Sequence, residues 1–209
     1  RCFAVDEKGH PVAPSAIAAL VAERELAREP GSTVIHNLIT SKAVPEIIRE
    51  NGGEPVRTRV GHSFIKAKMA ETNAVFGGEH SAHYYFRDFW RADSGMLAAM
   101  HVLAALGQQD KPLSEMMAKY NRYAASGEIN SRLDSAEAQA DRTEAVVKAF
   151  ADRAENVDRL DGVTVELKDG NWFNVRASNT EPLLRLNVEA DTQEAVDALV
   201  KEILAIIRA

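Results

Sequence analysis

Cysteine is almost missing from this sequence, because Cys2 is the only one among 209 residues. A single cysteine excludes an internal disulfide and a metal site built from several thiolates, and it favours a reducing compartment. Long apolar runs are missing as well: none approaches the roughly 20 residues that cross a bilayer, and the first residues lack the order of a signal peptide. We therefore predict a cytoplasmic protein with no membrane partner.

An excess of positive charge is also lacking, since 25 lysines and arginines face 31 aspartates and glutamates and the formal net charge is -6. A chain with this balance has no general attraction to nucleic acid or to anionic surfaces, so we expect no nucleic-acid partner. Any anion that it binds must be held by a local site.

Several common reaction centres have no signature here. No glycine-rich Walker or Rossmann pattern occurs, since Gly52-Gly53 is interpreted as a helix stop. No carboxylate cluster resembles a metal site, and no serine lies in a nucleophile elbow. The sequence therefore predicts a binding apparatus without an evident reaction centre of its own.

The composition is that of a globular protein, with 45% hydrophobic and 27% charged residues. A length of 209 residues favours two domains. The chain begins at Arg1 without a methionine and runs directly into an apolar segment, so we expect it to be the downstream part of a longer protein.

Residues 1–125 show strands alternating with helices, which predicts an α/β domain with a mixed, largely parallel sheet and flanking helices. The strand at 2–5 is expected to end in a tight turn. The helices are predicted at residues 14–29, 42–50, 62–71, 94–106 and 113–125, and the strands at 2–5, 33–36, 55–60 and 74–76.

Residues 126–209 show a different order, which predicts a small α+β domain with an antiparallel sheet and helices on one face. Lys168-Asp169-Gly170-Asn171 is a strong hairpin signal between two of its strands. The strands are predicted at residues 128–133, 163–167, 172–176 and 183–188, and the helices at 136–154 and 192–208.

The loop RASNTEP, residues 176–182, joins two predicted strands and suits a phosphate dianion. Arg176 donates in a fork, Ser178 and Thr180 bring hydroxyl donors, and Asn179 tolerates the backbone that turns amides inward. The alternative is a polar hairpin in which Arg176 pairs with a carboxylate such as Glu181.

The segment GGEHSAHYYF places Glu79 and Ser81 at alternate positions, where an extended backbone points both side chains the same way. A carboxylate that accepts from two neighbouring hydroxyls, with a serine beside it, suits a sugar, and His83 adds a polar contact or a proton path. The alternative is a surface loop with solvated histidines.

Gly61-His62-Ser63 opens a predicted helix, where free backbone amides favour an anion. His62 and Lys66 share one face of that helix and both are placed to approach a phosphate or a transferred proton. The alternative is a helix cap with an exposed lysine. The histidines that show no partner in the sequence are interpreted as structural: His10, His36 and His101.

Together these motifs resemble the α-D-phosphohexomutases, and among them most closely the phosphomannomutase/phosphoglucomutase group. The order and spacing match over essentially the whole chain, which corresponds to the third and fourth domains of a four-domain enzyme. The motifs that carry the resemblance are Gly61-His62-Ser63, Gly78-Glu79-His80-Ser81-Ala82-His83, Ser126-Gly127-Glu128-Ile129-Asn130 and RASNTEP.

The resemblance implies a role for each candidate residue. Glu79 and Ser81 would hold the sugar hydroxyls, and His62 would lie near the transferred phosphoryl group as the catalytic candidate in this chain. The phosphate at the non-reacting end would be held by four residues of the loop: Arg176, Ser178, Asn179 and Thr180.

The implied reaction interconverts hexose 1-phosphate and hexose 6-phosphate, of mannose or glucose, through a phosphoserine and a hexose 1,6-bisphosphate. Arg1 resembles the last residue of the family's Asp-x-Asp-x-Asp-Arg loop, so the Mg²⁺ ligands are expected upstream of it. The phosphoserine belongs to the missing N-terminal half of the same enzyme, so we expect this chain alone to be inactive. The alternatives are a non-catalytic sugar-phosphate binding module and a phosphoglucosamine mutase.

The sequence departs from the family pattern in two places. Ala82 stands where the sugar loop usually has glycine, and its methyl group disfavours a backbone angle open to glycine. We expect binding to survive this change. No lysine or arginine is evident near residues 36–39, where some relatives place one, and Lys42 is only a weak substitute.

Overall fold

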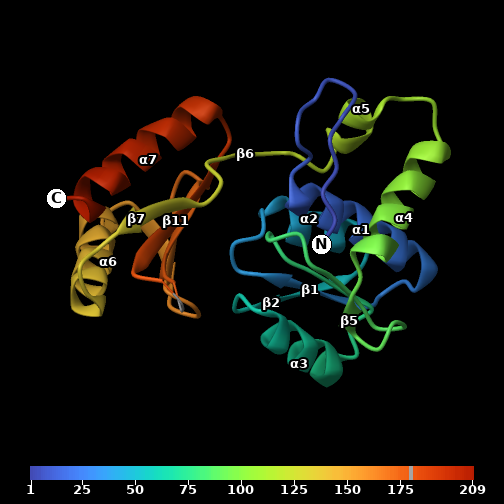
Figure 1. Cartoon of the computed structure of the whole chain (residues 1–209), viewed down its shortest axis with the longest axis horizontal. Coiled ribbons are helices and arrows are strands. Elements are labelled where there is room, and N and C mark those ends of the chain that lie inside the picture. Colours follow the sequence, from blue (N-terminus) through green and yellow to red (C-terminus); the bar gives the residue numbers. More distant parts are fainter. Residues whose placement is uncertain (179–180) are drawn as a thin grey trace. The chain divides into compact units, whose positions relative to one another are not determined.

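The computed structural model describes residues 1–178 and 181–209. The chain divides into two compact units, Arg1–Arg122 and Tyr123–Ala209, which are described separately here (Figure 1). The sequence analysis assigned residues 124–125 to the first domain, but they form strand β6 (Ala124–Ala125), which pairs with β11 (Leu183–Ala190) of the second unit. Across the described residues, no helix is long and apolar enough to cross a membrane.

The first unit is built on a mixed sheet, as predicted, with the strand order β2-β1-β3-β4-β5. The first three strands in this order run parallel, whereas β3–β4 and β4–β5 are antiparallel pairs. The strands are β1 (Thr33–Asn37), β2 (Glu54–Thr58), β3 (Phe76–Gly78), β4 (Tyr84–Phe86) and β5 (Ala92–Asp93).

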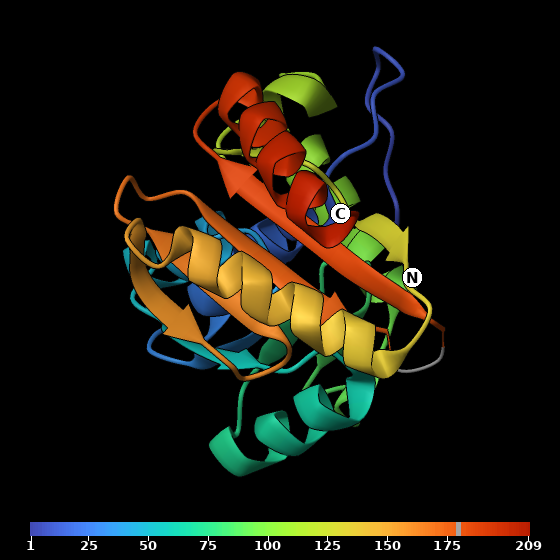
Figure 2. The ribbon, with the colours of Figure 1, turned by 90° about the vertical axis from the view of Figure 1, so that its left-hand side faces the viewer.

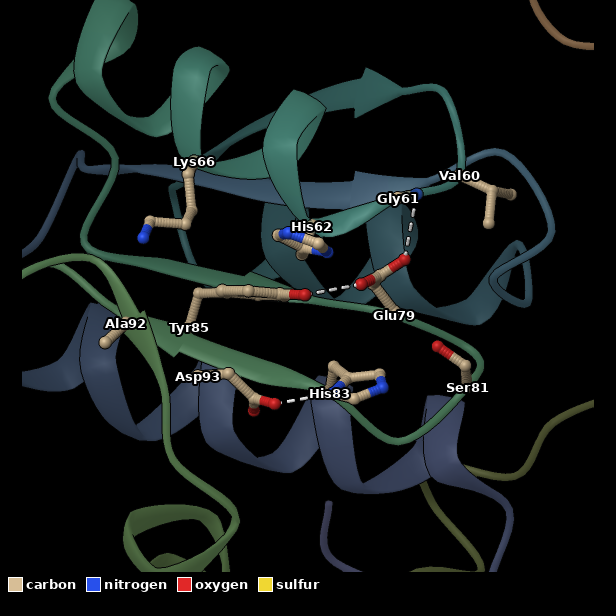
Figure 3. A pocket seen from close by; sticks show the side chains of 10 residues that line it. All are labelled: Val60, Gly61, His62, Lys66, Glu79, Ser81, His83, Tyr85, Ala92 and Asp93. Carbon is tan, nitrogen blue, oxygen red and sulfur yellow. Dashed lines mark hydrogen bonds and ion pairs between the residues drawn. The ribbon is translucent and has the colours of Figure 1, made fainter. Parts of the chain in front are cut away.

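Helices cover both faces of this sheet. Figures 1 and 3 show α3 on one face and α1 on the other. The helices are α1 (Pro14–Arg28), α2 (Ala43–Glu50), α3 (His62–Thr72), α4 (Gly95–Gly107) and α5 (Leu113–Met117).

Two glycines in β3 allow the helices to approach the sheet closely. A Cβ atom on Gly77 would lie 2.9 Å from Ile65 of α3, and one on Gly78 would lie 2.7 Å from Ala18 of α1. Both distances are shorter than carbon atoms tolerate, so larger residues would push the helices away. The end of β3, where Glu79 follows, is therefore fixed between two helices.

Two predictions for the first unit are wrong. Residues 2–5 form no strand but only an isolated bridge between Val5 and Pro11, and Phe3 and Val5 are 65% and 63% exposed, so no apolar layer covers them. The helix predicted at 113–125 ends at Met117. Buried Tyr120 follows, and the Arg122 guanidinium bonds both oxygens of Glu50, so tertiary contacts outweigh local helix preference.

The second unit has an antiparallel sheet with the order β6-β11-β10-β9-β8, and β7 also pairs with β11. Figure 2 shows α6 and α7 together on one face, as predicted, where Phe150 and Phe173 pack edge to face in the core. The remaining elements are β7 (Ile129–Arg132), α6 (Ala136–Phe150), β8 (Ala154–Asp158), β9 (Val163–Leu167), β10 (Trp172–Ala177) and α7 (Gln193–Ile207).

The predicted hairpin between β9 and β10 is confirmed: Gly170 has φ +85° and Asp169 accepts from the Asn171 backbone N–H. Strand β8 was not predicted, and the helix predicted at 136–154 overlaps its first residue. The helix ends at Phe150 instead. Most of β8 is exposed and its pairing with β9 is irregular, so it lacks the apolar alternation that marks a strand.

Acid is expected to destabilise the first unit through His36 of β1. Burial lowers the pKa of His36 from 6.5 to about 4, although its hydrogen bond to the Asn37 carbonyl acts the other way. The unfolded chain therefore takes up this proton first, and stability falls as the pH drops from 6.5 to about 4, by at most about 3 kcal/mol. Urea unfolding, followed through the Ile35 methyl signals, should show a smaller loss in His36→Asn; equal losses would contradict the assignment.

Candidate functional site

A cavity of about 380 Å³ in the first unit collects the predicted sugar-site residues. This volume suits a small-molecule ligand. Figure 3 shows the lining residues, which come from the segment before α3, from α3, β4 and β5, and from the turn after β3. Five of them were candidates from the sequence, namely His62, Lys66, Glu79, Ser81 and His83. Gly61 was named there as part of a helix start, and four were not named, namely Val60, Tyr85, Ala92 and Asp93.

Glu79 is the most deeply held of these side chains, with an exposure of 2%. Its Oε1 accepts from the Tyr85 hydroxyl at 2.6 Å, and its Oε2 accepts from Asn37 Nδ2 and from the Gly61 backbone N–H, both at 3.2 Å. A carboxylate has about four acceptor positions. Three are filled within the protein, so Glu79 has room for about one ligand hydroxyl rather than the two expected.

Tyr85 is a fixed donor to Glu79. Burial raises the pKa of the Tyr85 hydroxyl strongly, and its hydrogen bond to Glu79 and the charge of that carboxylate raise it further. The hydroxyl therefore keeps its proton over the physiological range, and the orientation of Glu79 is set by a neighbour on β4.

The backbone between Glu79 and His83 is a turn, not the extended segment predicted. The Glu79 N–H donates to the His83 carbonyl, and the Ala82 N–H donates to the Glu79 carbonyl. Glu79 and Ser81 nevertheless both line the cavity. The turn brings both side chains there, so the two share one cavity as predicted, but an extended backbone is not the reason.

Ala82 adopts the left-handed conformation that its methyl group was expected to disfavour, with φ +66° and no exposed surface. We expect Ala82→Gly to stay within about 1 kcal/mol of the wild type, since relief of about 1 kcal/mol of strain is offset by a lost buried methyl. Ala82→Val should cost about 2 kcal/mol or more, because a branched side chain adds strain and volume. Urea unfolding measures both; equal tolerance of glycine and valine would contradict this account.

His62 and Lys66 lie on one face of α3 and both line the cavity (Figure 3). Gly61 precedes the helix with φ +128°, a value that favours glycine, and its N–H is taken by Glu79. The first turn of α3 is thereby tied to the sugar loop. Lys42 precedes α2 and is not one of the residues described as lining the cavity.

Asp93 is a site residue that the sequence analysis missed. His83 Nδ1 lies 2.5 Å from Asp93 Oδ2, and the Tyr84 backbone N–H donates to Asp93 Oδ1. Burial alone would raise the pKa of Asp93, but the hydrogen bonds from His83 and Tyr84 hold it below its usual value. In the sequence, Asp93 directly precedes the Ser94 cap of α4, so it resembles an ordinary helix start.

The second unit has two arginines opposite each other on neighbouring strands. Arg176 of β10 is directly opposite Arg185 of β11, and Arg176 is 5% exposed. Within the described residues, the buried Nε atoms of both guanidinium groups have no hydrogen-bond partner. Glu128 lies 3.9 Å from Arg176 and 3.5 Å from Arg185. Two paired cations with unfilled donors are a typical anion site.

The loop after β10 was predicted to bind phosphate, and part of it can be described. Arg185 donates to Ser178 Oγ at 3.2 Å and lies 3.4 Å from Glu181, so Arg185 rather than Arg176 takes the carboxylate that the alternative reading proposed. Asn179 and Thr180 lie outside the described residues. Arg185 was missed because only the register of β10 and β11 places it beside Arg176.

A metal site was expected only upstream of Arg1. Among the described residues, no group of three or more His, Cys, Asp or Glu side chains is arranged to hold a metal ion. The Mg²⁺ assignment stays a prediction about residues outside this chain.

The comparisons with known proteins agree over both units. Residues 13–123 match the profile of phosphoglucomutase/phosphomannomutase, alpha/beta/alpha domain III, and residues 128–206 match that of the phosphoglucomutase/phosphomannomutase C-terminal domain. The chain is 40% identical to phosphohexose mutases of Xanthomonas campestris over 90% of its length, and 42% identical to a phosphomannomutase of Escherichia coli over 91%. It spans only 42% and 41% of these relatives.

The chain is also similar to a solved structure of a phosphoglucomutase/phosphomannomutase family protein from Burkholderia thailandensis, with a TM-score of 0.82 and 29% sequence identity. The alignment covers 99% of this chain and 44% of that protein's chain. Both profiles, the curated relatives and this structure therefore point the same way. The chain belongs to the phosphoglucomutase/phosphomannomutase family and corresponds to its domain III and C-terminal domain.

Proposed function

We propose that this chain supplies sugar and phosphate recognition to a phosphohexomutase that interconverts hexose 1-phosphate and hexose 6-phosphate of mannose or glucose. The family membership supports the reaction class. The cavity around Glu79 and the Arg176–Arg185 pair support the division of work between a sugar site and a phosphate site.

In the first unit, the sugar is held by the residues around Glu79. Glu79 accepts one hydroxyl, Ser81 offers a hydroxyl group that both donates and accepts, and His83 adds a further polar contact. His62 and Lys66 line the same cavity from α3 and lie where a phosphoryl group on the sugar would be stabilised by positive charge. Of these, His62 is the catalytic candidate.

In the second unit, the phosphate that is not being transferred is held by Arg176 with Arg185. The two guanidinium groups provide charge-assisted hydrogen bonds, and Ser178 adds a hydroxyl next to Arg185. Asn179 and Thr180, which lie outside the described residues, belong to the proposed phosphate site on the sequence alone. A phosphate dianion would compete with Glu128 for both arginines.

The complete reaction needs groups that we expect in the N-terminal half of the enzyme. A phosphoserine there transfers its phosphoryl group to the free hydroxyl of the hexose monophosphate, and the resulting bisphosphate reorients before its other phosphate returns to serine. Mg²⁺, bound upstream of Arg1, would supply charge stabilisation during the transfers. This chain contributes binding and orientation of both ends of the substrate.

The observation that carries this proposal is the cavity that gathers Glu79, Ser81, His83, His62 and Lys66 in a member of this family. A coupled assay of the intact protein with mannose 1-phosphate and glucose 1-phosphate, with and without Mg²⁺, tests it. Turnover of either sugar is expected, and turnover of neither would overturn the assignment. Amino-sugar turnover in its place would favour the phosphoglucosamine mutase.

Calorimetry on this chain helps to distinguish the mutase from the remaining alternative, a non-catalytic sugar-phosphate binding module. Glucose 1-phosphate should bind with 1:1 stoichiometry, and the chain should show no turnover by itself. Binding by an intact protein that turns over no hexose phosphate would favour the non-catalytic binding module.

A further inference from the structure

The ring of His83 has a charged partner on each of its nitrogens. Figure 3 shows Nδ1 directed at Asp93, and the distance to Asp93 Oδ2 is 2.5 Å. On the other side, Arg1 Nε donates to His83 Nε2 at 3.1 Å. A carboxylate only accepts and a guanidinium only donates. Both contacts are satisfied by one tautomer, in which Nδ1 carries the proton and Nε2 carries the lone pair.

Asp93 is itself fixed in place by the sheet. It is the last residue of β5, lies opposite Tyr85 of β4, and accepts from the Tyr84 N–H through Oδ1 at 3.0 Å. That contact leaves Oδ2 directed at His83, the residue that precedes β4. The carboxylate therefore holds the imidazole with the same antiparallel pair that builds the wall of the cavity.

We propose that Asp93 is a positioning residue, which holds His83 in the Nδ1–H tautomer so that the Nε2 lone pair, which accepts from Arg1 in this structure, accepts instead from a ligand hydroxyl when the cavity is filled. The ligand part rests on the proposed function, because the hydroxyl belongs to the hexose. Lys66 of α3 can only donate, and Glu79 has about one acceptor position left. Besides Glu79 and the Ser81 hydroxyl, His83 Nε2 thus provides a further acceptor for a sugar that carries several donors.

The tautomer can be measured without any substrate. The ring ¹⁵N signals of His83 in the whole chain, recorded at about pH 9 where imidazole is ordinarily neutral, distinguish Nδ1–H from Nε2–H. The His83→Gln variant identifies the signals by their loss. We expect the wild type to show Nδ1–H, and Nε2–H in the wild type would overturn the proposal.

Asp93→Asn should switch the tautomer. The asparagine oxygen keeps the Tyr84 N–H, so its NH₂ group faces His83 Nδ1, which must then accept; the ring becomes Nε2–H. Asp88→Asn is the matched control, because Asp88 lies between β4 and β5 and pairs with Arg87 at 3.0 Å; it should leave the tautomer unchanged. Retention of Nδ1–H in folded Asp93→Asn would also overturn the proposal. The wild-type measurement decides the question even if this variant does not fold.

Calorimetry with glucose 1-phosphate on the same samples separates this inference from the proposed function. The predicted tautomer without any binding supports the positioning role and counts against the sugar site. Binding of glucose 1-phosphate together with the Nε2–H tautomer supports the sugar site and overturns the positioning role of Asp93. If both hold, Asp93→Asn should weaken binding about tenfold, as the loss of one hydrogen bond of roughly 1.4 kcal/mol does.

Discussion

Replacing Glu79 with alanine should lower the free energy of unfolding of the first unit by about 4 kcal/mol and abolish sugar binding there. The substitution leaves three donors without an acceptor, namely the Tyr85 hydroxyl, Asn37 Nδ2 and the Gly61 N–H. Each buried donor that loses its partner costs about 1–3 kcal/mol. The total is a large part of the 5–15 kcal/mol that typically stabilises a domain.

Urea unfolding of the first unit, followed through the methyl signals of Ile35 and Ile65, measures this loss separately from the second unit. Glu79→Gln should lose about half as much, because the amide retains one oxygen and can donate to the Tyr85 hydroxyl. Glu71→Gln on α3 is the control, since this exposed carboxylate pairs only with Lys68 among the contacts described and should change stability by less than about 0.5 kcal/mol. Equal midpoints for Glu79→Ala and the wild type would show that the carboxylate does not organise the cavity.

Replacing Arg176 with alanine should weaken the binding of glucose 1-phosphate by roughly 10- to 100-fold, since hydrogen bonds to charged groups contribute about 1.5–3 kcal/mol. Arg176 is 5% exposed, lies opposite Arg185, and has a buried Nε without a partner among the described residues. The affinity of Arg176→Lys should fall between those of the wild type and Arg176→Ala, because lysine keeps the positive charge and loses the forked pair of guanidinium donors.

Calorimetry measures the affinity, and Arg159→Ala is the matched control, because Arg159 pairs with Glu144 on the surface of the same unit. Tryptophan fluorescence gives a second measurement. Trp172 is buried in the second unit, and in a Trp90→Phe background it is the only tryptophan. In this background, inorganic phosphate should raise the urea midpoint of unfolding of the second unit, followed through Trp172, when Arg176 is present and not in Arg176→Ala. Equal shifts in both would place the phosphate elsewhere.

Elements with a clear apolar rhythm were predicted well from the sequence. β9 was predicted to the residue, because three alternate valine and leucine side chains face the core of the second unit. β8 was not predicted, because mostly exposed residues form it. The end of α5 was not predicted either, because the chain beyond it is held by tertiary contacts such as that of Arg122 with Glu50. Local pattern decides structure only where it agrees with the packing around it.

The site shows the same limit. His62, Glu79 and Ser81 were predicted because they lie in motifs that resemble a known family, and all three line the same cavity. The groups that hold Glu79 were not found, because Asn37 is 42 residues away in the chain and Gly61 is 18. The parallel pairing of β1 with both β2 and β3 brings the ends of these segments together.

The three residues of β4 carry more than their length suggests. Tyr84 donates to backbone carbonyls of Cys2 and Pro14, whereas its neighbour Tyr85 donates to Glu79. Successive strand residues point to opposite faces, so a slip of one residue in pairing would exchange the two tyrosines. The N-terminal segment and the cavity around Glu79 would then both lose these hydrogen bonds at once. Correct alignment of this short strand during folding is therefore a condition for assembling the binding site at all.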